Sequence, residues 1–356
     1  MKKWISGLLA GLLLVTMGAG CSKTPGVSDQ PSSSENGAIT LPADSETSGT
    51  EAPESQENYN PLTGENDLTK GGTRPVGIMI GNNSTSRPQH GIDKADLYVE
   101  AETEGGITRI LAVFANAERI PAQLGPVRSA RSPFVTMAQA MDIVYAHAGG
   151  STPALDTLKK IDIDNINALS YDGSTFWRDE QLRKSKGLEY SMMTSGDKMQ
   201  SRIDKLKIGT AATRPVPFGF GDKAGSGAGA SLQVNVSDSR AVTFIYDSVS
   251  GLYTKGNGKI GDTATHKAAD GTPIRVANIL VLYADKVMEN ELTCNFKLAS
   301  GSGLLVTGGA SRPLSYTCTA DKLAFREEDG SELTVSPGKT YICLVNSKLK
   351  SKTALA

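Results

Sequence analysis

The first half of the chain alternates apolar strand-like runs with segments whose apolar residues recur at helical spacing. The runs that predict strands are 74–82, 95–102, 108–116 and 142–150. The segments with helical spacing are 133–141, 151–160 and 194–207. Strands that alternate with helices in this way predict a layered α/β (α+β) sandwich, which we place at residues 72–208.

The pattern changes after residue 208. Residues 209–231 are rich in glycine and predict a flexible joint. Residues 232–347 consist of β-type apolar runs separated by Gly, Asp-Gly and Pro-Gly turns, which predict a mainly β segment, and 348–356 form a short tail. The sequence leaves open whether this β segment folds alone or adds strands to the first sheet.

The first 21 residues have the organisation of a targeting segment. Lys2 and Lys3 precede an apolar run at 5–15, and small residues lead to Cys21. This arrangement resembles a bacterial lipoprotein signal peptide, although Gly18 stands where the usual motif has Leu. The apolar run is too short to cross a bilayer. We therefore expect acyl chains on Cys21, and an ordinary cleaved secretory signal is the alternative.

Residues 22–71 predict a disordered tether. They are rich in Ser, Glu, Pro, Thr and Gly, and acidic residues outnumber basic ones. Such a segment cannot bury enough apolar surface to fold. About 50 extended residues reach roughly 170 Å, so the folded part can act well away from the membrane surface.

Composition narrows the classes of partner and of chemistry. The formal net charge of −1 argues against nucleic acid as the main partner. The chain has three His and no HxH or HExxH spacing, so we predict no metal site and no cofactor. Cys294, Cys318 and Cys343 lie in apolar runs and are expected to be small buried residues, with their disulfide pairing left open.

Arginines gather at the ends of predicted strands and beside two predicted helix starts. Arg128 and Arg131 come just before a helix that we expect to begin at Ser132, the predicted N-cap. Guanidinium forks and helix amides both favour carboxylate or phosphate, so we predict a site for an anionic or carbohydrate-like ligand. Its predicted residues are Asn82, Arg87, Arg109, Arg128, Ser129, Arg131, Gly149, Gly150, Ser151, Trp177 and Arg178.

Three carboxylates offer two other interpretations of the same region. Glu100, Glu102 and Glu104 alternate, so on a strand they would share one face. Glu100 or Glu104 could act with His147 in acid–base catalysis, as in a hydrolase or transferase that acts on the cell wall. The other interpretation is that the carboxylates, with Asp179, pair with the arginines and only stabilise the fold.

Long motifs in the chain resemble the YerB family, bacterial lipoproteins defined by a domain of unknown function, DUF3048. The motifs are "RPVGIMIGNNSTSRPQHGIDKADLYVEAETEGGITRILAVF", "GPVRSAR", "HAGGSTP", "FWRD" and "SPGKTYICLV". The resemblance covers roughly residues 60–347. The resemblance implies a layered α/β fold and a lipoprotein anchor, and it brings no established activity or catalytic residues.

Together these observations predict a lipid-anchored protein on the extracytoplasmic side of the membrane. We expect a non-catalytic module that binds peptidoglycan, a wall polymer or an envelope protein. A wall-acting enzyme and a purely structural scaffold for a membrane complex remain the alternatives.

Overall fold

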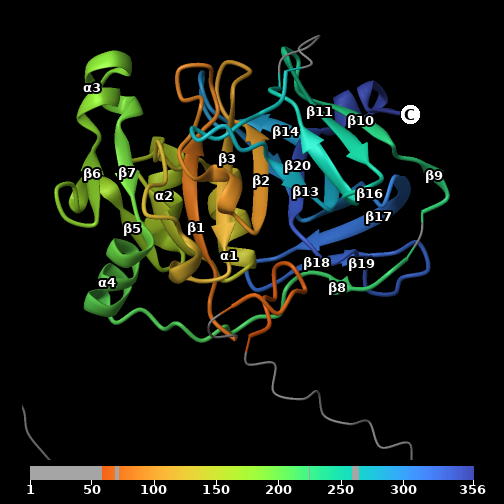
Figure 1. Ribbon diagram of the computed structural model, residues 1–356, viewed down its shortest axis with the longest axis horizontal. Helices are drawn as coiled ribbons and strands as arrows, with labels where there is room; N and C mark the ends of the chain where they lie inside the picture. Colours follow the sequence, from red (N-terminus) through yellow and green to blue (C-terminus); the bar gives the residue numbers. More distant parts are fainter. Residues whose placement is uncertain (1–57, 69–71, 224, 259–263) are drawn as a thin grey trace, which may run out of the picture. The chain divides into compact units, whose positions relative to one another are not determined.

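A twelve-stranded mixed sheet carries strands from both parts of the chain (Figure 1). The computed structural model describes residues 58–68, 72–223, 225–258 and 264–356, so the targeting segment, Cys21 and most of the tether lie outside the described residues. Along the sheet the strands are β18 (Leu323–Arg326), β17 (Ala310–Cys318), β16 (Ser300–Thr307), β14 (Asn278–Met288), β20 (Thr340–Asn346), β2 (Leu97–Glu102), β3 (Thr108–Phe114), β1 (Val76–Gly81), β4 (Val144–His147) and β5 (Asn165–Asn167). In addition β15 (Cys294–Lys297) pairs with β14, and β9 (Gly227–Ala228) pairs with β17.

The two halves of this sheet meet where β20 lies parallel to β2. The register places Leu97 opposite Thr340 and continues to Ala101 opposite Leu344. On its other side β20 pairs in parallel with β14. The last long strand of the chain is therefore inserted between the two halves, and the β segment extends the first sheet rather than forming a sheet of its own.

Both faces of the central sheet are covered, which explains why its strands read as continuous apolar runs. Residues of α1 (Ser132–Ala140) and α2 (Thr152–Lys160) pack on one face, in the same buried cluster as Val99 of β2. The neighbouring Tyr98 belongs to the cluster on the other face. That face is covered by α4 (Gly196–Leu206) and by a five-stranded sheet of β13 (Arg275–Val276), β12 (Leu252–Lys255), β11 (Arg240–Asp247), β10 (Ser231–Ser237) and β21 (Ala354–Leu355).

These layers confirm the predicted sandwich, with helices in the first part and mainly strands in the second. The predicted strands and helices of the first half appear within a few residues of their expected bounds.

A small hairpin of β6 (Phe176–Arg178) and β7 (Met192–Thr194) was not predicted. It carries α3 (Glu180–Lys186) and the 3-10 helix η4 (Leu188–Tyr190) between its strands, on the left of Figure 1. Neither α3 nor η4 buries a residue.

The remaining short elements connect these layers. The strand β8 (Gly219–Phe220) pairs in parallel with β19 (Thr334–Val335). Four further 3-10 helices are η1 (Ile92–Lys94), η2 (Ala117–Arg119), η3 (Ala168–Ser170) and η5 (Ser347–Lys352).

Two segments that we predicted to be flexible make close contacts. Leu62 and Leu68 are buried, so the folded part of the protein begins before residue 71, the predicted end of the tether. In the glycine-rich segment 209–231, a Cβ on Gly225 would lie 2.6 Å from the backbone of Ser311. Glycine in this segment therefore allows the backbone to pack closely against β17, in addition to any flexibility that it gives.

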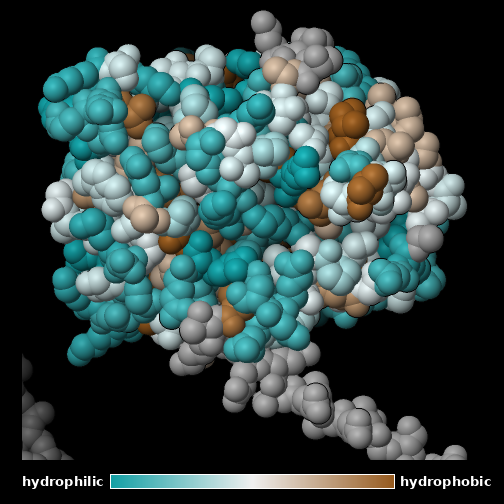
Figure 2. All heavy atoms as spheres, in the orientation of Figure 1, coloured by the Kyte–Doolittle hydropathy of each residue, from teal (hydrophilic) through white to brown (hydrophobic). Residues whose placement is uncertain are grey.

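The cysteines agree with the sequence prediction. All three described cysteines are free and buried, as expected. Burial raises the pKa of Cys294 to about 12 and that of Cys318 to about 11. The face in Figure 2 is mainly hydrophilic, with hydrophobic patches over the region of β10, β11 and β16. No helix among the described residues is long and apolar enough to cross a membrane.

A fragment spanning residues 58–356 is expected to unfold in urea in one cooperative transition, because the β2–β20 pairing gives both halves a common core. Trp177 is its single tryptophan and reports on the first half by fluorescence. The reactivity of its three thiols reports on the second half. The two midpoints should coincide, and midpoints that differ by more than the fitting error would contradict a shared core.

Candidate functional site

Four of the predicted arginines line one cleft, which we call the arginine cleft. It has a volume of about 480 Å³ and lies where β4 ends, beside the end of β1. Loops at the carboxyl ends of parallel strands are common ligand sites in α/β folds. The lining residues are Glu104, Arg109, Val127, Arg128, Ser129, Arg131, Ala148, Leu169, Arg178, Leu188 and Glu189.

Backbone hydrogen bonds fix the segment that carries Arg128 and Arg131. The Arg128 N–H donates to Met79 O at 2.8 Å, and Ala148 N–H donates to Arg128 O at 2.9 Å. Arg128 therefore lies between the ends of β1 and β4. A Cβ on Gly81 would lie 2.9 Å from Arg128 Cγ, so the glycine that ends β1 makes room for this side chain.

Glu104 holds two arginines at the floor of the cleft. Arg109 donates to both carboxylate oxygens of Glu104 at 2.6 and 3.0 Å. Arg131 does the same at 2.8 and 2.9 Å and also donates to Ala130 O. One carboxylate therefore faces two guanidinium groups, which leaves a positive charge at the floor.

Burial and neighbouring charges shift the pKa of Glu104 and that of Arg109. Burial alone would raise the pKa of Glu104, but the positive charges and hydrogen bonds of Arg109 and Arg131 hold it below its ordinary 4.5. Burial lowers the pKa of Arg109 to about 10, and the neighbouring Arg131 adds to the effect. Glu104 and Arg109 therefore both stay charged at neutral pH.

Arg128 and Arg178 lie at the rim and are paired more weakly. Arg128 donates to Glu189 O at 2.7 Å and to the Glu189 carboxylate at 3.1 Å, and it lies over the Tyr190 ring at 4.8 Å. Arg178 donates to Leu188 O at 2.8 Å and to Asp172 at 3.1 Å. Because the Glu189 side chain is 73% exposed, its ion pair with Arg128 is weak.

The helix start beside Arg131 contributes less than predicted. The N-cap of α1 is Arg131 and not Ser132, so the predicted cap is wrong by one residue. Phe134 and Val135 N–H both donate to Arg131 O, and Pro133 has no N–H. The amides of residues 133–135 are therefore already used or absent. At α2 the N-cap is Ser151, whose Oγ accepts from Ala154 N–H.

Gly149, Gly150, Ser151 and Trp177 do not line the cleft. The first three lie behind its wall, where Ala130 N–H donates to Gly149 O at 2.9 Å. Gly149 has a φ of +66°, and a Cβ there would lie 3.0 Å from Leu169 Cδ1, so this glycine allows Leu169 to pack over it. Trp177 is half-buried in β6, with Lys198 Nζ 5.8 Å from its ring.

Asn82, Arg87 and Glu100 belong to a separate buried network. Glu100 Oε1 accepts from Asn82 Nδ2 at 2.8 Å and from Thr108 Oγ1 at 2.6 Å, and Oε2 accepts from Tyr341 OH at 2.5 Å. Arg87 Nε donates to Asn82 Oδ1 at 3.1 Å. This network joins β2 and β3 to β20, and it does not reach the arginine cleft.

The network continues into the five-stranded sheet through Lys255. Its Nζ lies 3.6 Å from Glu100 Oε2 and 3.1 Å from His266 Nδ1, and His266 Nε2 lies 2.8 Å from Gln89 Oε1. Burial lowers the pKa of Lys255 and of His266. Burial would raise the pKa of Glu100, but the charge of Lys255 and two hydrogen bonds hold it below 4.5.

The proposed acid–base set is not assembled. The three alternating glutamates share no cationic partner: Glu100 pairs with Lys255, Glu102 with Lys286, and Glu104 with two arginines. The strand ends at Glu102, so the prediction that Glu104 shares its face is wrong. His147 is buried, with Nδ1 2.7 Å from Gly149 O and Nε2 3.3 Å from Asn165 Oδ1. Burial lowers its pKa below 6.5.

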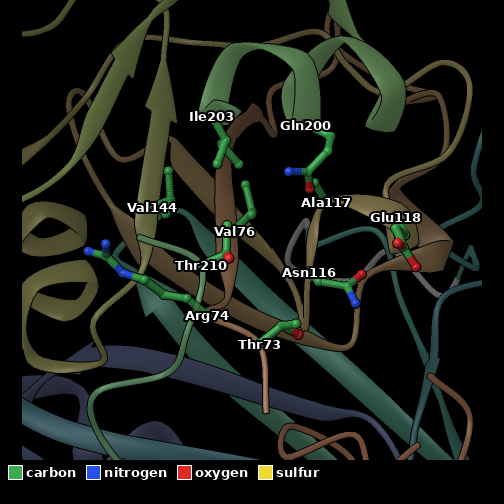
Figure 3. Close-up of a pocket in the computed structure, with 10 residues that line it drawn as sticks. All are labelled: Thr73, Arg74, Val76, Asn116, Ala117, Glu118, Val144, Gln200, Ile203 and Thr210. Carbon is green, nitrogen blue, oxygen red and sulfur yellow. The ribbon is translucent and has the colours of Figure 1, made fainter. Parts of the chain in front are cut away.

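A second cavity lies at the opposite ends of β1 and β4 (Figure 3). Its volume is about 160 Å³. Arg74 is its main charged group, and Figure 3 shows its side chain pointing away from the other lining residues, toward partners that include Asp142 at 2.9 Å. Its charge is thus already compensated. No group of three or more His, Cys, Asp or Glu among the described residues could hold a metal ion.

Sequence reasoning missed several residues of both clusters. Leu169, Leu188 and Glu189 line the cleft from 3-10 helices that carry no periodic signal. Lys255 was also missed, although it stands two residues after buried Tyr253 in β12 and therefore on the inward face. The alternation of inward and outward positions along this strand could have predicted that Lys255 is buried.

Three comparisons with known proteins agree with one another: the matching family models, the similar sequence and the similar structure are all DUF3048 or YerB proteins. Residues 62–209 match the family "Protein of unknown function (DUF3048) N-terminal domain", and 232–342 match the corresponding C-terminal domain. "Putative lipoprotein YerB" of Bacillus subtilis (strain 168) is 30% identical over 297 residues, which cover 80% of this chain and 85% of that protein. The crystal structure of YerB protein from Bacillus subtilis has a TM-score of 0.71 at 29% identity and covers 84% of this chain and 99% of that one.

Glu104→Gln is expected to lower the free energy of unfolding by about 2–3 kcal/mol, because two largely buried arginines lose their countercharge. Urea unfolding at pH 7 measures this change. The matched control, Glu189→Gln, removes an exposed carboxylate and should change stability by less than about 0.5 kcal/mol. Equal stability of Glu104→Gln and wild type would show that Glu104 does not support the fold.

The stability of wild type and that of Glu104→Gln should depend differently on pH. Because the folded-state pKa of Glu104 lies below 4.5, its stabilising contribution is complete above that pH and is lost as the pH falls through the folded-state value. The stability difference between wild type and Glu104→Gln should therefore shrink in acid. A difference that is constant from pH 7 to pH 3 would contradict this assignment.

Proposed function

This chain belongs to the DUF3048 family, and from that premise we propose that it is a lipid-anchored binding protein whose arginine cleft takes an anionic ligand of the cell envelope. A single observation carries the proposal: four arginines and two glutamates line one open cleft. Guanidinium groups recognise carboxylate and phosphate through paired N–H donors. A wall polymer or peptidoglycan fragment carries such groups.

The rim of the cleft supports exchange of partners. Arg128 is held by the side chain of Glu189, which is largely exposed and costs little to displace. An incoming anion can take the place of this carboxylate without disturbing Glu104. The floor then contributes its uncompensated positive charge, while Arg128 and Arg178 supply the exchangeable donors.

Two observations support a lipid anchor. One is the similarity to a protein described as a lipoprotein, and the other is the lipoprotein-like targeting segment, residues 1–21, with Cys21 as its last residue. The predicted tether would then hold the cleft on the extracytoplasmic side, within reach of wall components. The alternative of a wall hydrolase or transferase has no support in the geometry, because Glu100, Glu104 and His147 each belong to a different set of contacts.

The double variant Arg128→Gln/Arg178→Gln should bind a polyglycerol phosphate wall polymer at least tenfold more weakly than wild type, about 1.4 kcal/mol. Isothermal titration at two salt concentrations measures this, and wild-type binding should weaken with salt. Glu189→Gln should bind severalfold more tightly, because it removes the internal competitor.

Arg183→Gln is the matched control, since Arg183 lies exposed on α3 beside Glu180 and outside the cleft. It should bind as wild type does. Muropeptides provide a second ligand class for the same titration. The proposal fails if wild type binds neither ligand, or if binding is unaffected by loss of the two rim arginines.

A further inference from the structure

We propose that the ligand of the arginine cleft carries an apolar chain directly beside its anionic group, as an alkyl phosphate does. This inference rests on the proposed anion-binding function and deepens it. The evidence is the placement of apolar side chains in the cleft, the contacts that fix them and the size of the cleft.

Two of the exposed leucines lie in this cleft. Leu169 is 57% exposed and Leu188 is 54% exposed, and both line the cleft together with Val127 and Ala148. Eight large hydrophobic side chains are exposed among the described residues, and two of them stand among four arginines. Exposed apolar surface next to charge is typical of a binding site.

Specific contacts hold both leucines in place. Arg178 donates to Leu188 O at 2.8 Å, and Arg128 donates to the next carbonyl, Glu189 O. The N–H groups of Leu169 and Gly149 both donate to Asn167 Oδ1, at 3.1 and 2.9 Å. The rim arginines thus fix the position of Leu188, so the apolar wall and the cationic rim form one unit.

The size of the cleft also favours a ligand larger than a simple anion. At about 480 Å³ the cleft lies within the range of small-molecule sites, and an inorganic phosphate would occupy only a fraction of it. The lining also includes the exposed side chains of Leu169 and Leu188. A short hydrocarbon chain would cover these two side chains while its phosphate meets Arg128 and Arg178.

Titration of an alkyl phosphate series tests the inference. The chain from residue 22 onward is titrated with inorganic, ethyl, butyl and hexyl phosphate at constant ionic strength. Each methylene that becomes buried should raise affinity roughly two- to fourfold, so hexyl phosphate should bind at least tenfold more tightly than ethyl phosphate. Leu169→Ser/Leu188→Ser should remove most of this increase and leave the affinity for inorganic phosphate within twofold of wild type.

A matched control is Leu206→Ser, which changes an exposed leucine at the end of α4, outside the cleft. It should retain the full dependence on chain length. Vesicles of phosphatidic acid, with phosphatidylcholine vesicles as reference, distinguish the source of the ligand. Vesicle binding that hexyl phosphate competes away supports a membrane lipid, and hexyl phosphate binding without vesicle binding supports a soluble amphiphile.

The outcomes separate this inference from the function on which it rests. If inorganic phosphate binds through the rim arginines and chain length adds nothing, the inference is overturned and the proposed function stands. If a peptide with an apolar C-terminal residue binds more tightly than hexyl phosphate, the ligand class is wrong. If neither the phosphates nor the wall ligands bind, both proposals fail.

Discussion

The parallel pairing of β20 with β2 is the constraint on which the rest of the structure depends. It places the C-terminal half beside the strand that carries the glutamates, so that Tyr341 of β20 donates to Glu100 and Lys286 of β14 pairs with Glu102. Glu104, just beyond the strand end, remains for the arginines of the first half. Each carboxylate is thereby compensated without competing for the same cation.

This distribution separates charges that stabilise from charges that can exchange partners. Glu100 and Lys255 are almost fully buried, and loss of either partner would leave an uncompensated charge in the core. Glu104 fixes the floor of the cleft in the same way with two arginines. At the rim, Arg128 has an exposed partner, so an outside anion can compete there at low cost.

The sequence predicted the alternating elements and the buried cysteines, because each depends on local periodicity. It placed five arginines in one site, of which four line the cleft and Arg87 belongs to the Glu100 network. It could not show that β20 crosses to β2, since 241 positions separate Tyr341 from Glu100. For the same reason the Lys255 network was missed. The shared face expected for three glutamates was wrong at Glu104, because alternation holds only while the strand continues.

The central claim is that Arg128 and Arg178 exchange their carboxylate partners for an external anion and keep their bonds to backbone carbonyls. The most direct measurement follows the Nε–Hε signals of ¹⁵N-labelled arginine by NMR as hexyl phosphate is added, with the rim signals assigned from Arg128→Lys and Arg178→Lys. The account predicts saturable shifts for these two signals and much smaller shifts for Arg183, which lies outside the cleft. Rim signals that stay unchanged at saturating ligand, or shifts equal across all arginines, would contradict it.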